Sequence, residues 1–124
     1  MKFNFDGALF KETDSVGLGV IIRNDLGLVM AASTQVIPLP TSVETVEVLA
    51  ARNAICLARE LQFNKVIIEG DSEVVIKSLN SSNVSSTSFG HIVLDIKIFS
   101  TTFSEISFFH TRRQGNIVAH SIAR

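Results

Sequence analysis

The first residues of the chain alternate hydrophobic and polar side chains with the period of two that predicts a β-strand. In residues 2–9, Phe3 and Phe5 point to one face, and Asn4 and Asp6 point to the other. The strands that follow are hydrophobic enough for both faces of the sheet to be buried. A carboxylate in such a sheet is costly to bury unless it is paired or binds a metal ion. Asp6 is therefore the first candidate for a functional residue.

The same pattern predicts further strands and helices along the chain. Alternation bounded by turn residues predicts strands, whereas apolar positions three or four residues apart predict helices. Pro38 and Pro40 end the third strand, and Ser42 is the expected N-cap of the helix that follows. The expected strands are residues 2–9, 17–23, 28–36, 65–69 and 104–110, and the expected helices are residues 41–62, a second helix after residue 72, residues 90–101 and residues 116–124.

This order of elements, β-β-β-α-β-α-α-β-α, predicts a mixed five-stranded sheet of the α/β class. The first three strands are antiparallel, and two further strands are reached through helical crossovers, with helices on both faces of the sheet. Residues 80–88 are rich in Ser and Asn and are expected to form a loop. No repeat or linker is visible, so residues 1–124 are expected to form a single domain.

The composition is that of a globular protein with little net charge. Of the 124 residues, 46% are hydrophobic and 19% are charged, and the net charge is −1. This charge is no signature of a strong nucleic-acid binder, so such binding requires a local patch or metal ions. Because no apolar run reaches the length of a membrane span and no signal peptide is visible, we expect an intracellular protein, in the nucleus or the cytoplasm, without membrane association. We also expect a monomer.

Two more acids stand where the predicted fold brings them to Asp6. Glu47 lies on the first helix in line with Ala51 and Ala54, the small-residue face that a helix presents to a sheet. Asp71 ends the fourth strand, where ligands gather in open α/β sheets. Taken alone, Asp71 could cap the second helix, and Glu47 could interact with the dipole of the first. Three clustered carboxylates instead indicate a site for divalent cations, because they repel one another without one.

Five segments stand in the order and spacing of a known family. They are Asn4-Phe5-Asp6-Gly7-Ala8, Gly17-Leu18-Gly19-Val20-Ile21-Ile22-Arg23-Asn24, Val46-Glu47-Val48-Leu49-Ala50, Glu69-Gly70-Asp71-Ser72 and His110-Thr111-Arg112-Arg113-Gln114-Gly115-Asn116-Ile117-Val118-Ala119-His120. Over nearly the whole chain, they resemble the ribonuclease H-like domain. The resemblance is to its plant reverse-transcriptase-like branch, found as stand-alone domains and at the ends of retroelement-derived proteins.

The resemblance implies a metal-dependent endonuclease. The catalytic acids of the family fall on Asp6, Glu47 and Asp71, which in type 1 ribonuclease H hold two magnesium ions, for which manganese is the alternative. The ions activate a water and stabilise the leaving oxygen as the RNA strand of an RNA–DNA hybrid is hydrolysed. Strand choice in the family depends on 2′-hydroxyls and groove shape, so weak sequence preference is expected.

The fourth acid of the family is replaced in this chain. It belongs to an Asn-x-x-Ala-Asp segment in the last helix, and here its position is held by His120. We expect His120 to occupy the fourth catalytic position. The alternative is that it is only a surface residue of the last helix. A neutral imidazole offers a nitrogen and no charge, so the second metal ion should bind more weakly.

Contacts to nucleic acid are expected near both ends of the chain. The resemblance assigns them to Asn4, Gly7 and Asn116. The basic turn at Arg112 and Arg113 is expected to contact backbone phosphates, with a solvated turn as the alternative. The basic protrusion of some bacterial homologues is absent, because the segment between the second and third helices is short and rich in Ser; modest affinity for substrate is therefore expected.

Two functions remain open from the sequence. The first is an endonuclease on RNA–DNA hybrids with Mg²⁺ or Mn²⁺, which the three acids favour. The second is a weakly active or inactive nucleic-acid-binding or interaction module, which His120 and the near-neutral charge favour. A 3′–5′ exonuclease on a related fold is disfavoured, because that class has a second acid two residues after the first, where Ala8 stands.

Overall fold

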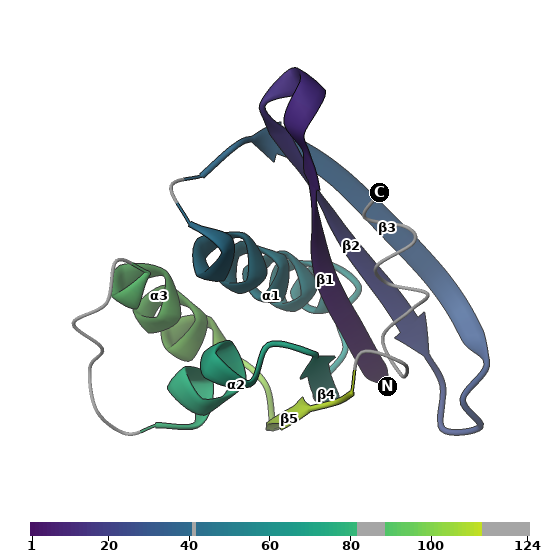
Figure 1. Cartoon of the computed structure of the whole chain (residues 1–124). Helices are drawn as coiled ribbons and strands as arrows, with labels where there is room; N and C mark the ends of the chain where they lie inside the picture. Colours follow the sequence, from purple (N-terminus) through teal and green to yellow (C-terminus); the bar gives the residue numbers. More distant parts are fainter. Residues whose placement is uncertain (41, 82–88, 113–124) are drawn as a thin grey trace.

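The strands and helices are arranged around one mixed sheet (Figure 1). The structure is a computed structural model that describes residues 1–40, 42–81 and 89–112. The elements in chain order are β1 (Lys2–Phe10), a 3₁₀ turn (Lys11–Thr13), β2 (Ser15–Arg23), β3 (Val29–Pro38), α1 (Val43–Glu60), β4 (Lys65–Gly70), α2 (Glu73–Asn80), α3 (Gly90–Ser100) and β5 (Glu105–His110). The strand order in the sheet is β3-β2-β1-β4-β5.

The pairing of the strands confirms the predicted mixed five-stranded sheet. β1, β2 and β3 form the antiparallel meander, with Phe5 of β1 opposite Val20 of β2. β4 pairs with β1 in parallel, and β5 pairs with β4 in parallel. The pairing of β1 with β4 covers only Lys2 to Asn4. β1 therefore continues beyond the segment that pairs with β4. The place beside Asp6 where the two strands part is called the opening between β1 and β4.

Local signals in the sequence explain where the elements begin and end. The Asn24 side chain accepts hydrogen bonds from the backbone N–H groups of Leu26 and Leu28, and Gly27 takes a φ of 79°. This turn joins β2 to β3 as predicted. Ser42 caps α1 by accepting a hydrogen bond of 3.1 Å from the backbone of Thr45. Both the turn and the cap are confirmed.

Several boundaries differ from the prediction by one or two residues, and the ends of β3 and α1 are the informative cases. β3 continues through Pro38, which pairs with Ser15, instead of ending at Val36. Proline is tolerated there because β3 is an edge strand and needs no hydrogen bond on its outer side. α1 ends at Glu60, two residues early, and Gln62 adopts a left-handed conformation with φ 63°.

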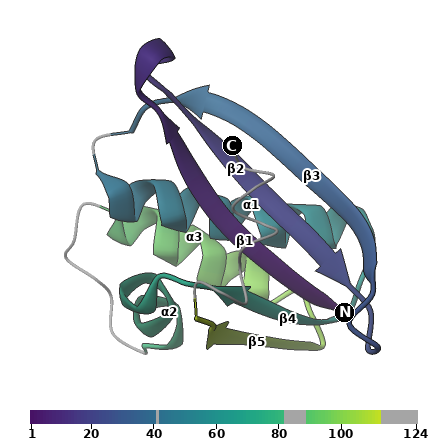
Figure 2. The same ribbon diagram turned by 45° about the vertical axis from the view of Figure 1, so that its right-hand side comes forward.

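The described helices cover one face of the sheet (Figures 1 and 2). α1 packs on β1 and β2, while α2 and α3 pack beside it. Phe3 and Phe5 are fully buried beneath α1, whose Ala50, Ala51 and Ala54 allow close approach. Helices were expected on both faces, but the expected last helix, residues 116–124, lies outside the described residues. Within the described part of the chain, no helix is long and apolar enough to cross a membrane.

Candidate metal centre

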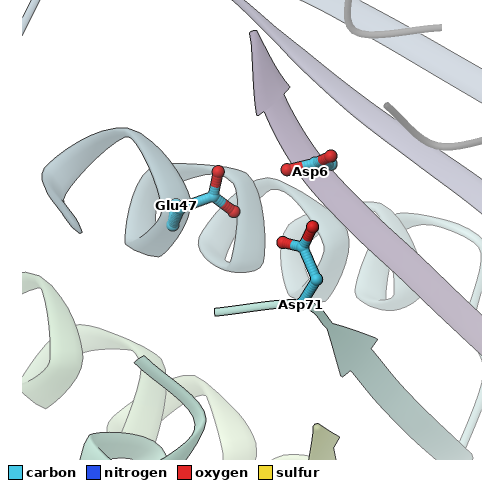
Figure 3. A group of neighbouring side chains, drawn as sticks. All are labelled: Asp6, Glu47 and Asp71. Atoms are coloured by element: carbon cyan, nitrogen blue, oxygen red, sulfur yellow. The ribbon is translucent and has the colours of Figure 1, made fainter. Parts of the chain in front are cut away.

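Three carboxyl groups from three separate elements meet at the opening between β1 and β4. Asp6 comes from β1, Glu47 from α1, and Asp71 from the residue after β4, and their side chains point toward one another (Figure 3). One oxygen of each carboxyl group lies within 4.8 Å of the other two. The structure thus brings together the three acids that the sequence singled out, at a spacing that a shared cation could bridge.

Asp6 is held at the centre of the sheet. Only 2% of its surface is exposed, and the Gly7 backbone N–H donates to its Oδ1 at 2.8 Å. The alternation of β1 directs Phe3 and Phe5 into the core and turns Asp6 to the opposite face. Because β4 leaves β1 after Asn4, the Asp6 carboxylate can face the opening and reach across it.

Gly7 permits the close contact that brings Glu47 to Asp6. A Cβ atom added at Gly7 would overlap Cγ1 of Val46 and would lie 3.6 Å from Oε1 of Glu47. Val46 itself is buried against β1, with 3% of its surface exposed. The absence of a side chain at Gly7 therefore sets the distance between α1 and the Asp6 carboxylate. The sequence analysis missed this packing role, although a glycine beside a buried acid was a signal for it.

Asp71 is placed by the end of β4 rather than by a capping role. The N-cap of α2 is Ser72, whose Oγ accepts from the Val75 backbone at 3.4 Å, so the capping alternative for Asp71 was wrong. Gly70, just before it, lies against the Phe5 ring, where an added Cβ would overlap the ring carbons. β4 can therefore end directly beside β1, with Asp71 at the opening.

The position of Glu47 does not fit the alternative that it only interacts with the dipole of α1. It lies in the second turn of α1, whereas the acid in the first turn, where the helix dipole acts most strongly, is the exposed Glu44. Burial, the charge of Asp6 and a hydrogen bond with Asp6 raise the pKa of Glu47 to about 9, with a further contribution from Asp71. Because this pKa lies above neutral pH, Glu47 keeps its proton at neutral pH and can donate it in the hydrogen bond to Asp6.

The cluster has the donor set of a divalent cation site. Oε2 of Glu47 is buried and has no hydrogen-bond partner. A buried oxygen in this state is costly unless a ligand satisfies it. Carboxylate oxygens are the ligands that Mg²⁺ and Mn²⁺ prefer, and a cation would offset the repulsion among the three acids. The residues present therefore fit such an ion.

The other predicted site residues are placed differently. Asn4 is only 5% exposed, so its expected contact with nucleic acid stays a prediction without support from its position. Arg112 is exposed just after β5, where the neighbouring Thr111 donates its backbone N–H to Gly70 at 2.9 Å. Arg112 thus lies on the chain that leaves the sheet near Asp71. Arg113, Asn116 and His120 lie outside the described residues.

Solved structures share this fold over almost the whole chain. The ribonuclease H1 of Halobacterium salinarum matches with a TM-score of 0.88 at 22% identity, covering 98% of this chain and 92% of that one. The N-terminal ribonuclease H domain of a Mycobacterium tuberculosis protein matches with 0.84 at 17% identity, covering 98% and 90%. LC11 ribonuclease H1, solved with an RNA/DNA hybrid, matches with 0.83 at 18% identity, covering 98% and 91%. The fold is therefore ribonuclease H-like.

The sequence itself identifies the family. Residues 4–124 match the model of the reverse transcriptase-like family, and the chain belongs to that family. A comparison with curated proteins found no match.

Proposed function

We propose that the protein is a metal-dependent endonuclease that hydrolyses the RNA strand of RNA–DNA hybrids. The observation that carries this proposal is the convergence of Asp6, Glu47 and Asp71, with a buried Glu47 oxygen that has no hydrogen-bond partner. The ribonuclease H-like fold supports it, as do two solved structures of similar fold that contain an RNA/DNA hybrid: LC11 ribonuclease H1 and a foamy viral protease–reverse transcriptase.

The three acids would hold Mg²⁺ or Mn²⁺, and two ions are expected. When bound, the ions supply an activated water and stabilise the charge that develops on the leaving oxygen. As the most buried of the three acids, Asp6 would be the shared ligand. Glu47 would hold a cation only after losing its proton to the solvent, because only the ionised carboxyl group is a good ligand. Arg112 would contact a backbone phosphate of the substrate.

The direct test of this function is cleavage of a labelled RNA–DNA hybrid by the purified protein in Mg²⁺ and in Mn²⁺. We expect cleavage of the RNA strand that stops when EDTA removes the metal, and no cleavage of a DNA duplex of the same sequence. Cleavage that continues in EDTA would contradict the proposal.

A second candidate function is a hybrid-binding module with weak or no catalysis. His120, in the position of the fourth acid of the family, is the observation that favours it. Binding of the hybrid without cleavage in either metal would decide for the module and against the endonuclease.

Replacing His120 by an acid tests its role at the fourth position. His120→Asp should tighten Mg²⁺ binding and raise the Mg²⁺-dependent cleavage rate several-fold, because a carboxylate adds a charged oxygen ligand. Calorimetric titration of Mg²⁺ and initial cleavage rates measure the two effects. His120→Asn is the matched control, since it has the same shape as the aspartate without its charge. Equal metal affinity in all three proteins would place His120 outside the site.

Adding one methyl group at Gly7 tests the packing that positions Glu47. Gly7→Ala should lower the free energy of unfolding by about 1–3 kcal/mol, because the new Cβ forces α1 away from β1. It should also reduce hybrid cleavage, because Glu47 moves with the helix. Gly27→Ala is the control: it strains a positive φ in a turn with no atoms nearby, so it should lower stability without affecting cleavage. Wild-type stability and cleavage in Gly7→Ala would refute the packing role.

A further inference from the structure

β3 presents an unprotected edge. It is the outermost strand on one side of the sheet, and no strand of the described residues pairs with its outer side (Figure 2). It is ten residues long, and the sequence contains no charged residue between Asp25 and Glu44. Exposed edge strands are normally short or carry charges, because their free N–H and C=O groups pair readily with another strand. Of the features that protect an edge strand, β3 has only a proline at its end, Pro38.

The opposite edge of the sheet is protected. β5 is six residues long and begins with Glu105, and the Asn80 side chain of α2 donates to the Phe108 carbonyl at 3.0 Å. α2 also packs against this strand. The edge formed by β5 therefore has a charged residue and a helix against it, whereas the longer edge formed by β3 has neither among the described residues.

The side chains of β3 are apolar and exposed at both ends. Val36 is 65% exposed and Met30 is 58% exposed, whereas the centre of the strand carries the small polar residues Ser33 and Thr34. The pairing with β2 shifts register beside Met30, so the regular part of the edge is residues 31–37. About Thr34 this regular part is complementary to itself, because the small residues Ala31 and Ala32 precede Thr34 and the large apolar residues Val36 and Ile37 follow it.

We propose that a second copy of this chain pairs with β3 in antiparallel fashion, with Thr34 on the two-fold axis. Ala32 then lies opposite the Val36 of the second copy, and Thr34 lies opposite its counterpart. Apolar and Thr–Thr cross-strand pairs stabilise a sheet, and the uncharged edge allows two identical strands to approach without repulsion. A two-fold pairing of this kind provides hydrogen-bond partners for the outer N–H and C=O groups of β3 in both copies. It differs from the monomer expected from the sequence, and the oligomeric state measured in solution decides between the two.

The pairing leaves the acid cluster accessible. A two-fold axis perpendicular to the sheet keeps the helices of both copies on the same face, and β2 separates β3 from β1, which carries Asp6. One strand pair buries an area at the low end of specific interfaces, so a dissociation constant in the micromolar range is expected.

Sedimentation equilibrium between about 5 and 500 µM tests the proposal. The wild-type mass should rise with concentration from 13.5 kDa toward twice that value. Ala32→Lys/Val36→Lys should stay at the mass of one chain, because it places like charges opposite each other at both ends of the pairing. Ala32→Lys/Val36→Glu should recover the dimer at low salt. A single-chain mass for the wild type throughout, a dimer that the two lysines leave unchanged, or no recovery in the charge-paired variant would each overturn the proposal.

Hydrogen exchange of the wild-type protein provides a test that needs no substitution. The backbone amides of residues 31–37 that point away from β2 should exchange more slowly at high than at low protein concentration, while those of β5 exchange at the same rate. Equal exchange of residues 31–37 at both concentrations would overturn the proposal. Neither experiment depends on cleavage, so the pairing and the proposed endonuclease function can fail independently.

Discussion

Asp71→Asn should reduce metal-dependent cleavage of an RNA–DNA hybrid by roughly 10³-fold or more. The substitution keeps the shape of the side chain and removes its charge. Asp71 is one of only three carboxyl groups that converge at the opening between β1 and β4 within the described residues. The loss of one charged ligand weakens the binding of the cations and misplaces those that remain. The measurement is the initial rate of RNA-strand cleavage at saturating Mg²⁺ and Mn²⁺.

The control for this substitution is Asp95→Asn. Asp95 lies on α3, half exposed, and its carboxylate is 3.8 Å from Arg52 in a surface ion pair. Surface pairs of this kind contribute little to stability, so Asp95→Asn should cleave at the wild-type rate. Equal rates for the wild type and Asp71→Asn would show that cleavage, if present, takes place elsewhere.

Glu47→Gln should make the metal-free protein more stable, by on the order of 1–3 kcal/mol at pH 8. Glu47 is buried next to Asp6 and Asp71, and its Oε2 has no hydrogen-bond partner. In the absence of a cation, an ionised Glu47 would be repelled by its neighbours and deprived of water, so the folded protein keeps Glu47 protonated at pH 8, far above its ordinary pKa of 4.5, and loses stability by doing so. A neutral amide of the same shape removes this cost. Mg²⁺ should then raise the melting temperature of the wild type more than that of the variant.

The direction of the pH effect follows from the raised pKa. The pKa of Glu47 is about 9 in the folded protein, against 4.5 for the ordinary carboxyl group. Between these two values the folded protein holds a proton that the unfolded chain has lost, so the free energy of unfolding falls as the pH rises. Below about pH 4.5 both states are protonated and the effect vanishes. The advantage of Glu47→Gln should therefore be larger at pH 8 than at pH 5.

Thermal unfolding in EDTA at these two pH values measures the effect. Glu44→Gln is the matched control, because Glu44 lies on the same helix but is exposed in its first turn. That substitution removes a favourable interaction with the helix dipole and should lower stability by about 0.3–1 kcal/mol. A Glu47→Gln variant less stable than the wild type at pH 8 would show that Glu47 does not destabilise the metal-free protein.

The order and type of the described elements could be predicted because local signals agreed with tertiary packing. The alternation of Phe3 and Phe5 defined β1, the turn at Asn24 defined the hairpin, and Ser42 capped α1. The exact ends were less predictable. Whether a strand continues through Pro38 depends on whether it lies at an edge, which only the assembled sheet decides.

The residues of the candidate site could be predicted from the sequence, but the packing around them and their electrostatics could not. Asp6 and Glu47 stood out because they are acids on faces that the pattern predicted to be buried, and Asp71 because it is an acid at the end of a strand. The roles of Gly7 and Gly70 depend on contacts with Val46 and Phe5, which are distant in sequence. The raised pKa of Glu47 depends likewise on its burial and on its nearness to Asp6, both of which arise only in the folded protein.

Amide NMR during a Mn²⁺ titration tests the central claim most directly, because paramagnetic broadening reports where the ion binds. The structure predicts that the signals of Gly7, Glu47 and Ser72 broaden first, since these residues belong to or adjoin the three acids. The same titration of Asp71→Asn should require much more Mn²⁺. Broadening centred on another part of the molecule, or none at millimolar Mn²⁺, would contradict a metal centre formed by Asp6, Glu47 and Asp71.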